Sequence, residues 1–136
     1  MQYLLLLANA PDAREDTDAR SGDEVWSDWA AYTRALHEAG VLVSGAGLHG
    51  VDTATSVRVR AGERLLTDGP FADTKEHLIG YYVLDVPGLD AALDWAAKVP
   101  NVRTGTVEVR PVLPGSTSEE MVSAFAGTAT GDALAP

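Results

Sequence analysis

The sequence predicts an α+β fold in which an antiparallel sheet carries two helices on one face. Two observations lead to this prediction. Short segments that are apolar throughout, or that alternate in polarity, recur along the chain, which is the pattern of strands. Between them lie two longer segments whose apolar residues recur at helical spacing, which is the pattern of amphipathic helices.

The chain opens with a strand that a helix follows. Residues 2–8, QYLLLLA, are too short for a helix and uniformly apolar, so we expect a strand covered on both faces. A helix is predicted over residues 22–39, where Ser21 and Glu24 are spaced as a capping box and Gly40 can end the helix. The apolar residues of this helix recur at helical spacing: Val25, Trp29, Tyr32 and Leu36.

Several strands are predicted in the middle of the chain. Residues 41–48 form a strand that two glycines interrupt, and glycine inside a strand marks a bulge or a close approach of backbones. Residues 55–60, TSVRVR, alternate cleanly, and a short turn at Ala61 and Gly62 predicts a hairpin with the segment that follows. Residues 79–86, IGYYVLDV, are apolar on both faces apart from one aspartate.

The second helix and the last strand complete the pattern. Pro87 can begin a helix that ends before Pro100, and residues 106–112, TVEVRPV, form the last strand. From Pro114 the composition shifts to Gly, Ser, Thr and Ala, so we expect residues 114–136 to form a mostly flexible tail with about one helical turn. The stripe of the second helix consists of Leu89, Ala92, Leu93 and Ala96.

This order of elements predicts a ferredoxin-like arrangement in one domain, residues 1–113. Two helices cover only one face of a sheet, yet the first strand is apolar on both, through Leu4 and Leu6 on one side and Leu5 and Leu7 on the other. A further layer is needed to bury the second face. We therefore expect a homodimer that packs sheet against sheet.

Composition excludes several classes of function. The 136 residues include no cysteine, which rules out disulfides, thiolate chemistry and zinc sites built on cysteine. The net charge of -10 repels phosphate backbones and disfavours nucleic-acid binding. The apolar run at the start is too short for a signal peptide or a membrane span, so we expect a cytoplasmic protein that does not bind membranes. The three histidines are not spaced as a metal motif, and we expect neither a metal nor another cofactor.

With the elements placed, the stretch TDGPFADTKEHLIGYYVLDV resembles the signature of the DGPF proteins, a branch of the YCII-related family. AGVLVSGAGL, TSVRVR and VEVRPV are similar to that family too, so the resemblance covers residues 2–113. It implies a dimeric ferredoxin-like α+β barrel and frequent bacterial linkage to extracytoplasmic-function sigma factors, but no settled activity.

The resemblance also bears on catalysis. Some YCII-related enzymes use a His-Asp pair, with one residue on the first helix and one just after the second. The corresponding positions fall near Trp29 and near Pro100, and neither neighbourhood supplies the expected group. The pair is therefore not carried over, and any chemistry must use other residues.

Asp68 is the carboxylate that stands out. An aspartate in a turn commonly accepts a hydrogen bond from the N–H two residues on, but that residue is Pro70, which has none. Asp68 then ties the loop through another group, or it serves a ligand as an acid or base. His49 follows a glycine-rich segment and is either a proton-transfer partner of Asp68 or a metal ligand, or else an exposed loop histidine. We name four candidates for substrate binding, whose alternatives are solvated or packing roles: Phe71, Lys75, Tyr82 and Trp29.

Two hypotheses of function result. In the first, a pocket near Asp68 binds a small molecule or catalyses a lyase- or isomerase-type proton transfer with Asp68 and His49. In the second, the chain is a noncatalytic partner in bacterial stress or sigma-factor signalling, which binds through the acidic residues 12–28 and the tail. The first expects Asp68 in a cavity, and the second expects a filled core there.

Overall fold

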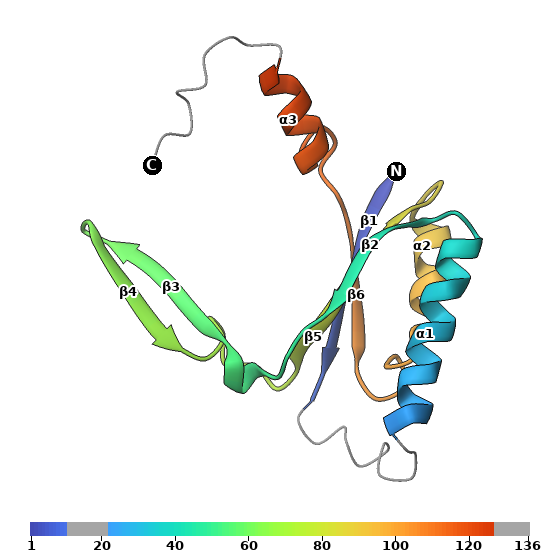
Figure 1. Cartoon of the computed structure of the whole chain (residues 1–136), viewed down its shortest axis with the longest axis horizontal. Helices are drawn as coiled ribbons and strands as arrows, with labels where there is room; N and C mark the ends of the chain where they lie inside the picture. The colour runs from blue at the N-terminus through green and yellow to red at the C-terminus, as the bar shows by residue number, and fades with distance from the viewer. Residues whose placement is uncertain (11–21, 127–136) are drawn as a thin grey trace.

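A computed structural model describes residues 1–10 and 22–126 of the chain. Figure 1 shows a sheet with two helices on one side and two elements that project from the other side. The elements in chain order are β1 Gln2–Asn9, α1 Gly22–Glu38, β2 Leu42–Gly47, β3 Thr55–Arg60, β4 Glu63–Asp68, β5 His77–Asp85, α2 Leu89–Ala96, β6 Thr106–Pro111 and α3 Ser118–Ala126. A 3-10 turn at Val51–Thr53 precedes β3.

The main sheet has four antiparallel strands in the order β2-β5-β1-β6. In β1, Leu5 lies opposite Tyr82 of β5 on one side and opposite Val109 of β6 on the other. This order, with α1 and α2 on one face, confirms the predicted α+β, ferredoxin-like fold. The prediction did not separate β3 and β4 from this sheet, whereas the structure pairs them as a sheet of their own.

The core lies between the sheet and the two helices. Alternate residues of β1 point into it, as the period of a strand requires, and Leu5 is fully buried. Leu36 of α1 and Leu84 of β5 are equally buried. The core consists of Tyr3, Leu5, Leu7, Tyr32, Leu36, Tyr82, Leu84, Val86, Ala92, Ala96 and Val99.

The other face of the sheet is apolar and only partly covered. Leu4 lies opposite Val83, and Leu6 lies opposite Tyr81, so these four side chains form adjacent rows on that face. All four are half-buried. Among the described residues no helix or strand packs over this face as a layer (Figure 1). The predicted homodimer, which would cover it, stays a prediction.

The hairpin of β3 and β4 leaves the body of the molecule (Figure 1). Its two-residue turn has positive φ at both Ala61 (52°) and Gly62 (78°), the geometry of a type I′ turn, which matches the twist of paired strands. The tight turn at Ala61 and Gly62 that the sequence predicts is therefore confirmed.

The segment after the last strand is more ordered than the sequence suggests. Within residues 114–136 the structure has the nine-residue helix α3, where we expected about one turn. The Thr117 hydroxyl donates to Glu120 Oε1 (2.8 Å) and accepts the Glu120 N–H (3.2 Å), so this pair caps the helix start. Thr117 and Glu120 have the spacing of a capping box, a signal that our sequence analysis missed.

The first helix begins where we predicted it, at Gly22, although Ser21 and the cap assigned to it lie outside the described residues.

Within residues 1–10 and 22–126, no helix combines the length and the apolar character that crossing a bilayer demands.

Candidate functional site

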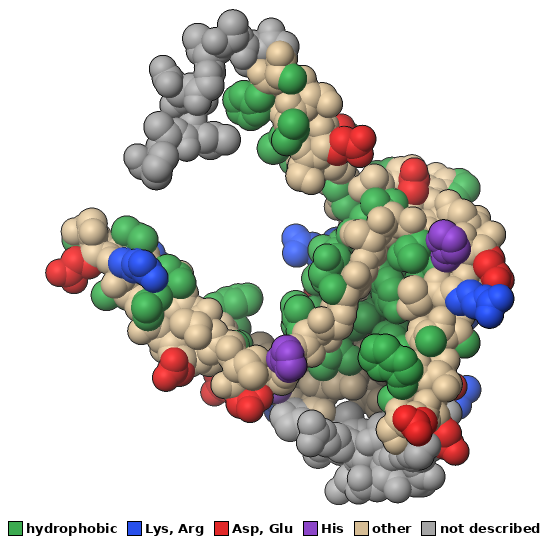
Figure 2. Space-filling view, in the orientation of Figure 1, with side chains coloured by type: hydrophobic (Ala, Val, Ile, Leu, Met, Phe, Trp, Pro, Cys, Tyr) green, Lys and Arg blue, Asp and Glu red, His purple; other side chains and the backbone are tan. Residues whose placement is uncertain are grey.

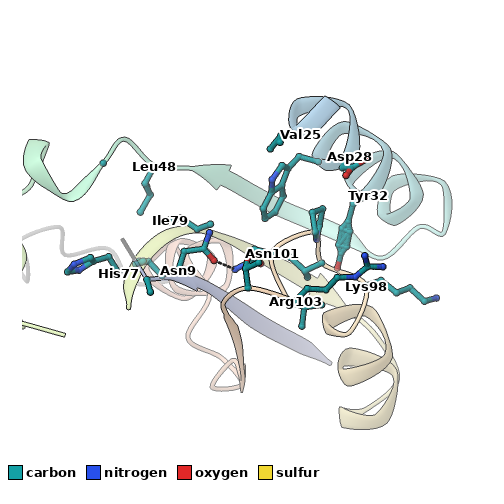
Figure 3. A pocket seen from close by; sticks show the side chains of 18 of the residues that line it. Asn9, Val25, Asp28, Tyr32, Leu48, His77, Ile79, Lys98, Asn101 and Arg103 are labelled. Atoms are coloured by element: carbon teal, nitrogen blue, oxygen red, sulfur yellow. Dashed lines mark hydrogen bonds between the residues drawn. The ribbon is translucent and has the colours of Figure 1, made fainter. Parts of the chain in front are cut away.

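A pocket of about 1310 Å³ lies where α1, the start of β5 and the segment after α2 meet (Figure 3). Ligand pockets commonly have roughly 300–1,000 Å³, so this one has room for a small organic molecule together with water. Three further segments of chain complete its lining: the end of β1, the loop after β2 at residues 48–52, and residues 97–104. The pocket is on the helix side of the sheet.

One face of α1 forms a wall of the pocket. Val25, Asp28, Trp29 and Tyr32 all line it, and their spacing of three, four and seven residues places them on one side of a helix. The apolar stripe predicted from the sequence therefore continues beyond the core into the pocket. Leu36, one turn further on, belongs to the core alone.

Tyr32 is fixed in that wall by two contacts. Its hydroxyl donates to the Trp95 carbonyl oxygen at 2.9 Å, and its ring meets that of Tyr82 edge to face at 5.4 Å. Burial, with a smaller contribution from Tyr82, raises the pKa of the Tyr32 hydroxyl well above its ordinary value. Tyr32 therefore stays protonated and has a structural role rather than that of a base.

A polar corner closes the pocket near the end of β1. Asn101 is only 5% exposed, and its side-chain N–H₂ donates to the Ala8 carbonyl (3.2 Å) and to Asn9 Oδ1 (2.9 Å). Its own Oδ1 has no hydrogen-bond partner among the described residues. The backbone approaches closely here, because a Cβ on Gly105 would lie 2.2 Å from the Ala8 carbonyl oxygen. Only glycine fits at position 105.

Two histidines line the opposite end of the pocket from two cationic side chains. The Leu48 N–H donates to the Ile79 carbonyl (2.9 Å), so the loop that carries His49 runs beside the start of β5, where His77 lies. Figure 3 shows His77 and Leu48 at one end, and Lys98 and Arg103 at the other.

Lys98 and Arg103 give the cationic end its charge, and both are exposed to solvent. Lys98 Nζ lies 5.0 Å from the centroid of the Trp95 ring, a cation–π contact that holds the ammonium group beside the pocket. Two carboxylates, Asp28 and Asp52, line the same pocket, so its described lining holds two cationic and two anionic side chains.

The model of the YCII-related domain family matches residues 1–116. The chain belongs to the YCII-related family. An uncharacterized protein of Rhizobium meliloti (strain 1021) is 39% identical to it over 114 residues, which cover 82% of this chain and 92% of that protein.

Among solved structures, this YCII-related chain is similar to the 5-chloro-2-hydroxyhydroquinone dehydrochlorinase of Burkholderia phenoliruptrix AC1100 in complex with 2,5-dihydroxybenzoquinone. The TM-score is 0.51 at 12% identity, and the match covers 83% of this chain and 94% of the other. At this identity the likeness shows the fold alone.

The structure brings together only two of the six site residues that the sequence analysis named. Trp29 and His49 line the pocket. Tyr82 is buried behind it, where its hydroxyl shares a hydrogen bond of 2.6 Å with Thr33 Oγ1. Asp68, Phe71 and Lys75 are exposed and do not line the pocket, and Phe71 is 84% exposed.

Asp68 is the last residue of β4 and pairs with Thr55, the first residue of β3, so it lies at the base of the hairpin, at the opposite end from the turn at Ala61 and Gly62. Its carboxylate has no hydrogen bond or ion pair within the described part of the chain. The turn after it is tied by other groups: the Gly69 N–H donates to the Ala54 carbonyl (2.8 Å), and Ser56 Oγ donates to the Gly69 carbonyl (2.7 Å). Asp68 is thus neither enclosed in a cavity nor packed in a filled core, so neither of our expectations for it is met.

Several pocket residues were not found from the sequence, namely Asp28, His77, Lys98, Asn101 and Arg103. Asp28 could have been found, because it stands one turn before Tyr32 on the same helix face. The others come together only through the sheet register and the loop after α2. In residues 1–10 and 22–126 no three histidine or acidic side chains gather as a metal site would require.

Proposed function

We propose that this YCII-related chain binds a small planar organic anion in the pocket and transfers a proton to or from it, a lyase- or isomerase-type step. One observation carries the proposal: a pocket joins a histidine end, an aromatic wall and a cationic end. Lys98 and Arg103 attract the anionic group, the ring of Trp29 contacts the planar body, and His49 exchanges the proton.

The position of the pocket supports this assignment. The two places where some YCII-related enzymes carry their His-Asp pair fall near Trp29 and near Pro100, and both residues line the pocket. Their side chains exchange no protons, so the acid-base group must come from elsewhere in the same pocket. Imidazole is the side-chain group best suited to proton exchange near neutral pH, which favours His49, with His77 nearby as a second candidate.

Binding is tested with 2,5-dihydroxybenzoquinone, the compound bound to the dehydrochlorinase, and with simple aryl carboxylates as further probes. We expect isothermal titration calorimetry to show binding by the unaltered chain. Lys98→Ala and Arg103→Ala should each weaken it about tenfold, since each removes one charge-assisted contact. Lys75→Ala is the matched control and should leave the affinity unchanged, because Lys75 lies outside the pocket.

Proton transfer is tested separately from binding. In D₂O, the chain should accelerate replacement of the ring C–H protons of the bound quinone by deuterium, as seen by loss of their ¹H NMR signal. His49→Ala should abolish this acceleration while the probe still binds. If none of the probes binds at millimolar concentration, or if the exchange survives His49→Ala and His77→Ala together, the proposed function is wrong.

The alternative role in sigma-factor signalling stays a prediction. Much of the acidic segment 12–28 assigned to it lies outside the described residues.

A further inference from the structure

Asp52 lines the pocket from the 3-10 turn Val51–Thr53, three residues after His49. Its carboxylate makes no hydrogen bond and no ion pair with any described residue. Asp28, the other acid of the described lining, takes part in an interaction of its own. Of these two acids, Asp52 is therefore the one whose oxygens stay open to a ligand.

The turn that carries Asp52 is fixed by three hydrogen bonds. The N–H and the hydroxyl of Thr53 both donate to the Gly50 carbonyl, at 3.0 and 2.7 Å. The Ala54 N–H donates to the Val51 carbonyl at 3.1 Å. Because the backbone of the turn is held in this way, the Asp52 side chain leaves it from a defined position.

Gly50 allows the carboxylate to fold back along the loop. A Cβ at position 50 would lie 2.6 Å from Asp52 Oδ1, a distance at which the two atoms would overlap. Asp52 Oδ1 thus rests against the backbone of Gly50, and Gly50 itself lines the pocket. The carboxylate therefore lies on the pocket wall.

This part of the wall can be reached from solution. Asp52 and His49 are both exposed. Figure 2 shows acidic side chains and a histidine at the surface where the hairpin of β3 and β4 joins the body, and Figure 1 places the segment between β2 and β3 at this junction. A ligand that enters the pocket here meets the carboxylate directly.

An open carboxylate accepts hydrogen bonds and donates none, so it binds a cation or a donor group. A metal ion needs several ligands, and within residues 1–10 and 22–126 no three histidine or acidic side chains gather. An ammonium group has three donors, which one exposed carboxylate cannot satisfy together. A hydroxyl group has a single donor, which the carboxylate satisfies fully with a charge-assisted hydrogen bond. Asp52 therefore fits a ligand hydroxyl best.

We infer that the pocket selects planar anions that also carry a hydroxyl group, and that Asp52 accepts the hydrogen bond of this hydroxyl. The inference rests on the proposed function, because Lys98 and Arg103 must hold the anionic group. An anion without a hydroxyl adds a negative charge to a pocket that already holds the Asp52 carboxylate and offers that carboxylate no donor. The substrate class is thereby narrowed to hydroxy-substituted planar anions.

Matched pairs of ligands test the inference. In the first pair, para-hydroxybenzoate is compared with para-methoxybenzoate, which has an oxygen at the same place but no donor. In the second pair, para-hydroxycinnamate and its methoxy counterpart span a longer distance. Calorimetry with the unaltered chain should show, in at least one pair, that the hydroxy compound binds about tenfold or more tightly than its methoxy partner, the effect of one hydrogen bond to a charged group.

Variants assign this preference to the carboxylate. Asp52→Ala should remove it while the methoxy compound still binds, and Asp52→Asn should keep part of it, because an amide oxygen still accepts a hydrogen bond. Gly50→Ala should lower it as well, since the new Cβ displaces Asp52 Oδ1 without removing its charge. Asp68→Ala is the matched control and should leave it unchanged, because Asp68 is exposed and does not line the pocket. Circular dichroism should show each variant folded.

The outcomes separate the role of Asp52 from the proposed function. If the compounds bind but the hydroxyl gives no gain in either pair, or if the gain survives Asp52→Ala, the inference about Asp52 is wrong and the proposed function stands. If none of these compounds binds at millimolar concentration, the inference is also overturned. The proposed function falls with it when 2,5-dihydroxybenzoquinone does not bind either.

Discussion

At the scale of single residues, the corner of Asn101 and Gly105 constrains the pocket most tightly. The Gly105 N–H donates to the Asn101 carbonyl at 2.8 Å, and the Asn101 side chain reaches back to Ala8 and Asn9 at the end of β1. The loop after α2 is thereby tied to the central strand. Lys98 and Arg103 lie on or beside the same loop. The contacts of Asn101 and Gly105 therefore determine the position of the cationic end of the pocket.

Gly105→Ala should destabilise the fold by about 1–3 kcal/mol, the usual cost of overpacking, because the new Cβ would lie 2.2 Å from the Ala8 carbonyl oxygen. Urea unfolding measures the change. Gly47→Ala is the matched control, since a Cβ on Gly47 meets nothing within 4 Å, and it should leave the free energy of unfolding nearly unchanged. Equal stability of the two variants would show that the corner is not tightly packed.

Tyr32 makes the stability of the fold depend on pH in the alkaline range. Burial raises the pKa of its hydroxyl in the folded chain, so above about pH 10 the unfolded chain loses this proton while the folded chain keeps it. The unfolded state then binds fewer protons, and stability falls with rising pH by up to about 1.4 kcal/mol per pH unit from this group.

Tyr32→Phe separates this effect from that of the other tyrosines. At pH 7 the variant should be about 1 kcal/mol less stable, because the hydrogen bond to the Trp95 carbonyl is lost. Above pH 10 the difference should narrow, since the variant has no proton to lose at this position. Urea unfolding at pH 7 and above pH 10 measures the free energy of unfolding of the two proteins. If their difference is the same at both pH values, Tyr32 does not cause the alkaline loss of stability.

At the scale of elements, the hairpin of β3 and β4 is shaped by its turn. Ala61 adopts a φ of 52°, a left-handed conformation that costs an alanine about 1–2 kcal/mol, whereas asparagine tolerates it better. Residues 61 and 62 are the two central positions of this type I′ turn, and such turns prefer Asn-Gly there.

Ala61→Asn should therefore stabilise the hairpin by about 0.5–1 kcal/mol, and Ala61→Val should weaken it, because a β-branched residue fits positive φ poorly. Amide hydrogen exchange is the measurement, with protection of the β3 and β4 amides rising in the first variant and falling in the second. If both variants shift protection in the same direction, the turn does not have this geometry.

At the scale of the whole molecule, periodicity predicted the fold better than the site. The stripe from Val25 to Leu36 and the alternation in residues 55–60 depend on local spacing, and the structure confirms the helix and the strand that they predict. Asp68 shows what local spacing cannot predict. Pro70 does deny it the usual N–H donor, but where its loop lies depends on which strands pair, and β4 pairs with β3 alone.

The cationic end of the pocket illustrates the same limit. Lys98 and Arg103 follow α2, and they line the same pocket as the histidines of the β2 and β5 segments only because the chain crosses the sheet between them. Nothing local to either segment indicates that they share a pocket. His49 and Trp29 were found because glycine spacing and a helical stripe marked their neighbourhoods.

Chemical-shift mapping by NMR tests most directly the central claim that ligands bind on the helix side of the sheet. A ¹⁵N-labelled chain is titrated with 2,5-dihydroxybenzoquinone and with the aryl carboxylates. We expect the amide signals that move to belong to residues 48–52, 77–79 and 97–104 and to the first half of α1. Signals that move around Asp68 to Lys75 instead, or no movement with any of these probes, would contradict it.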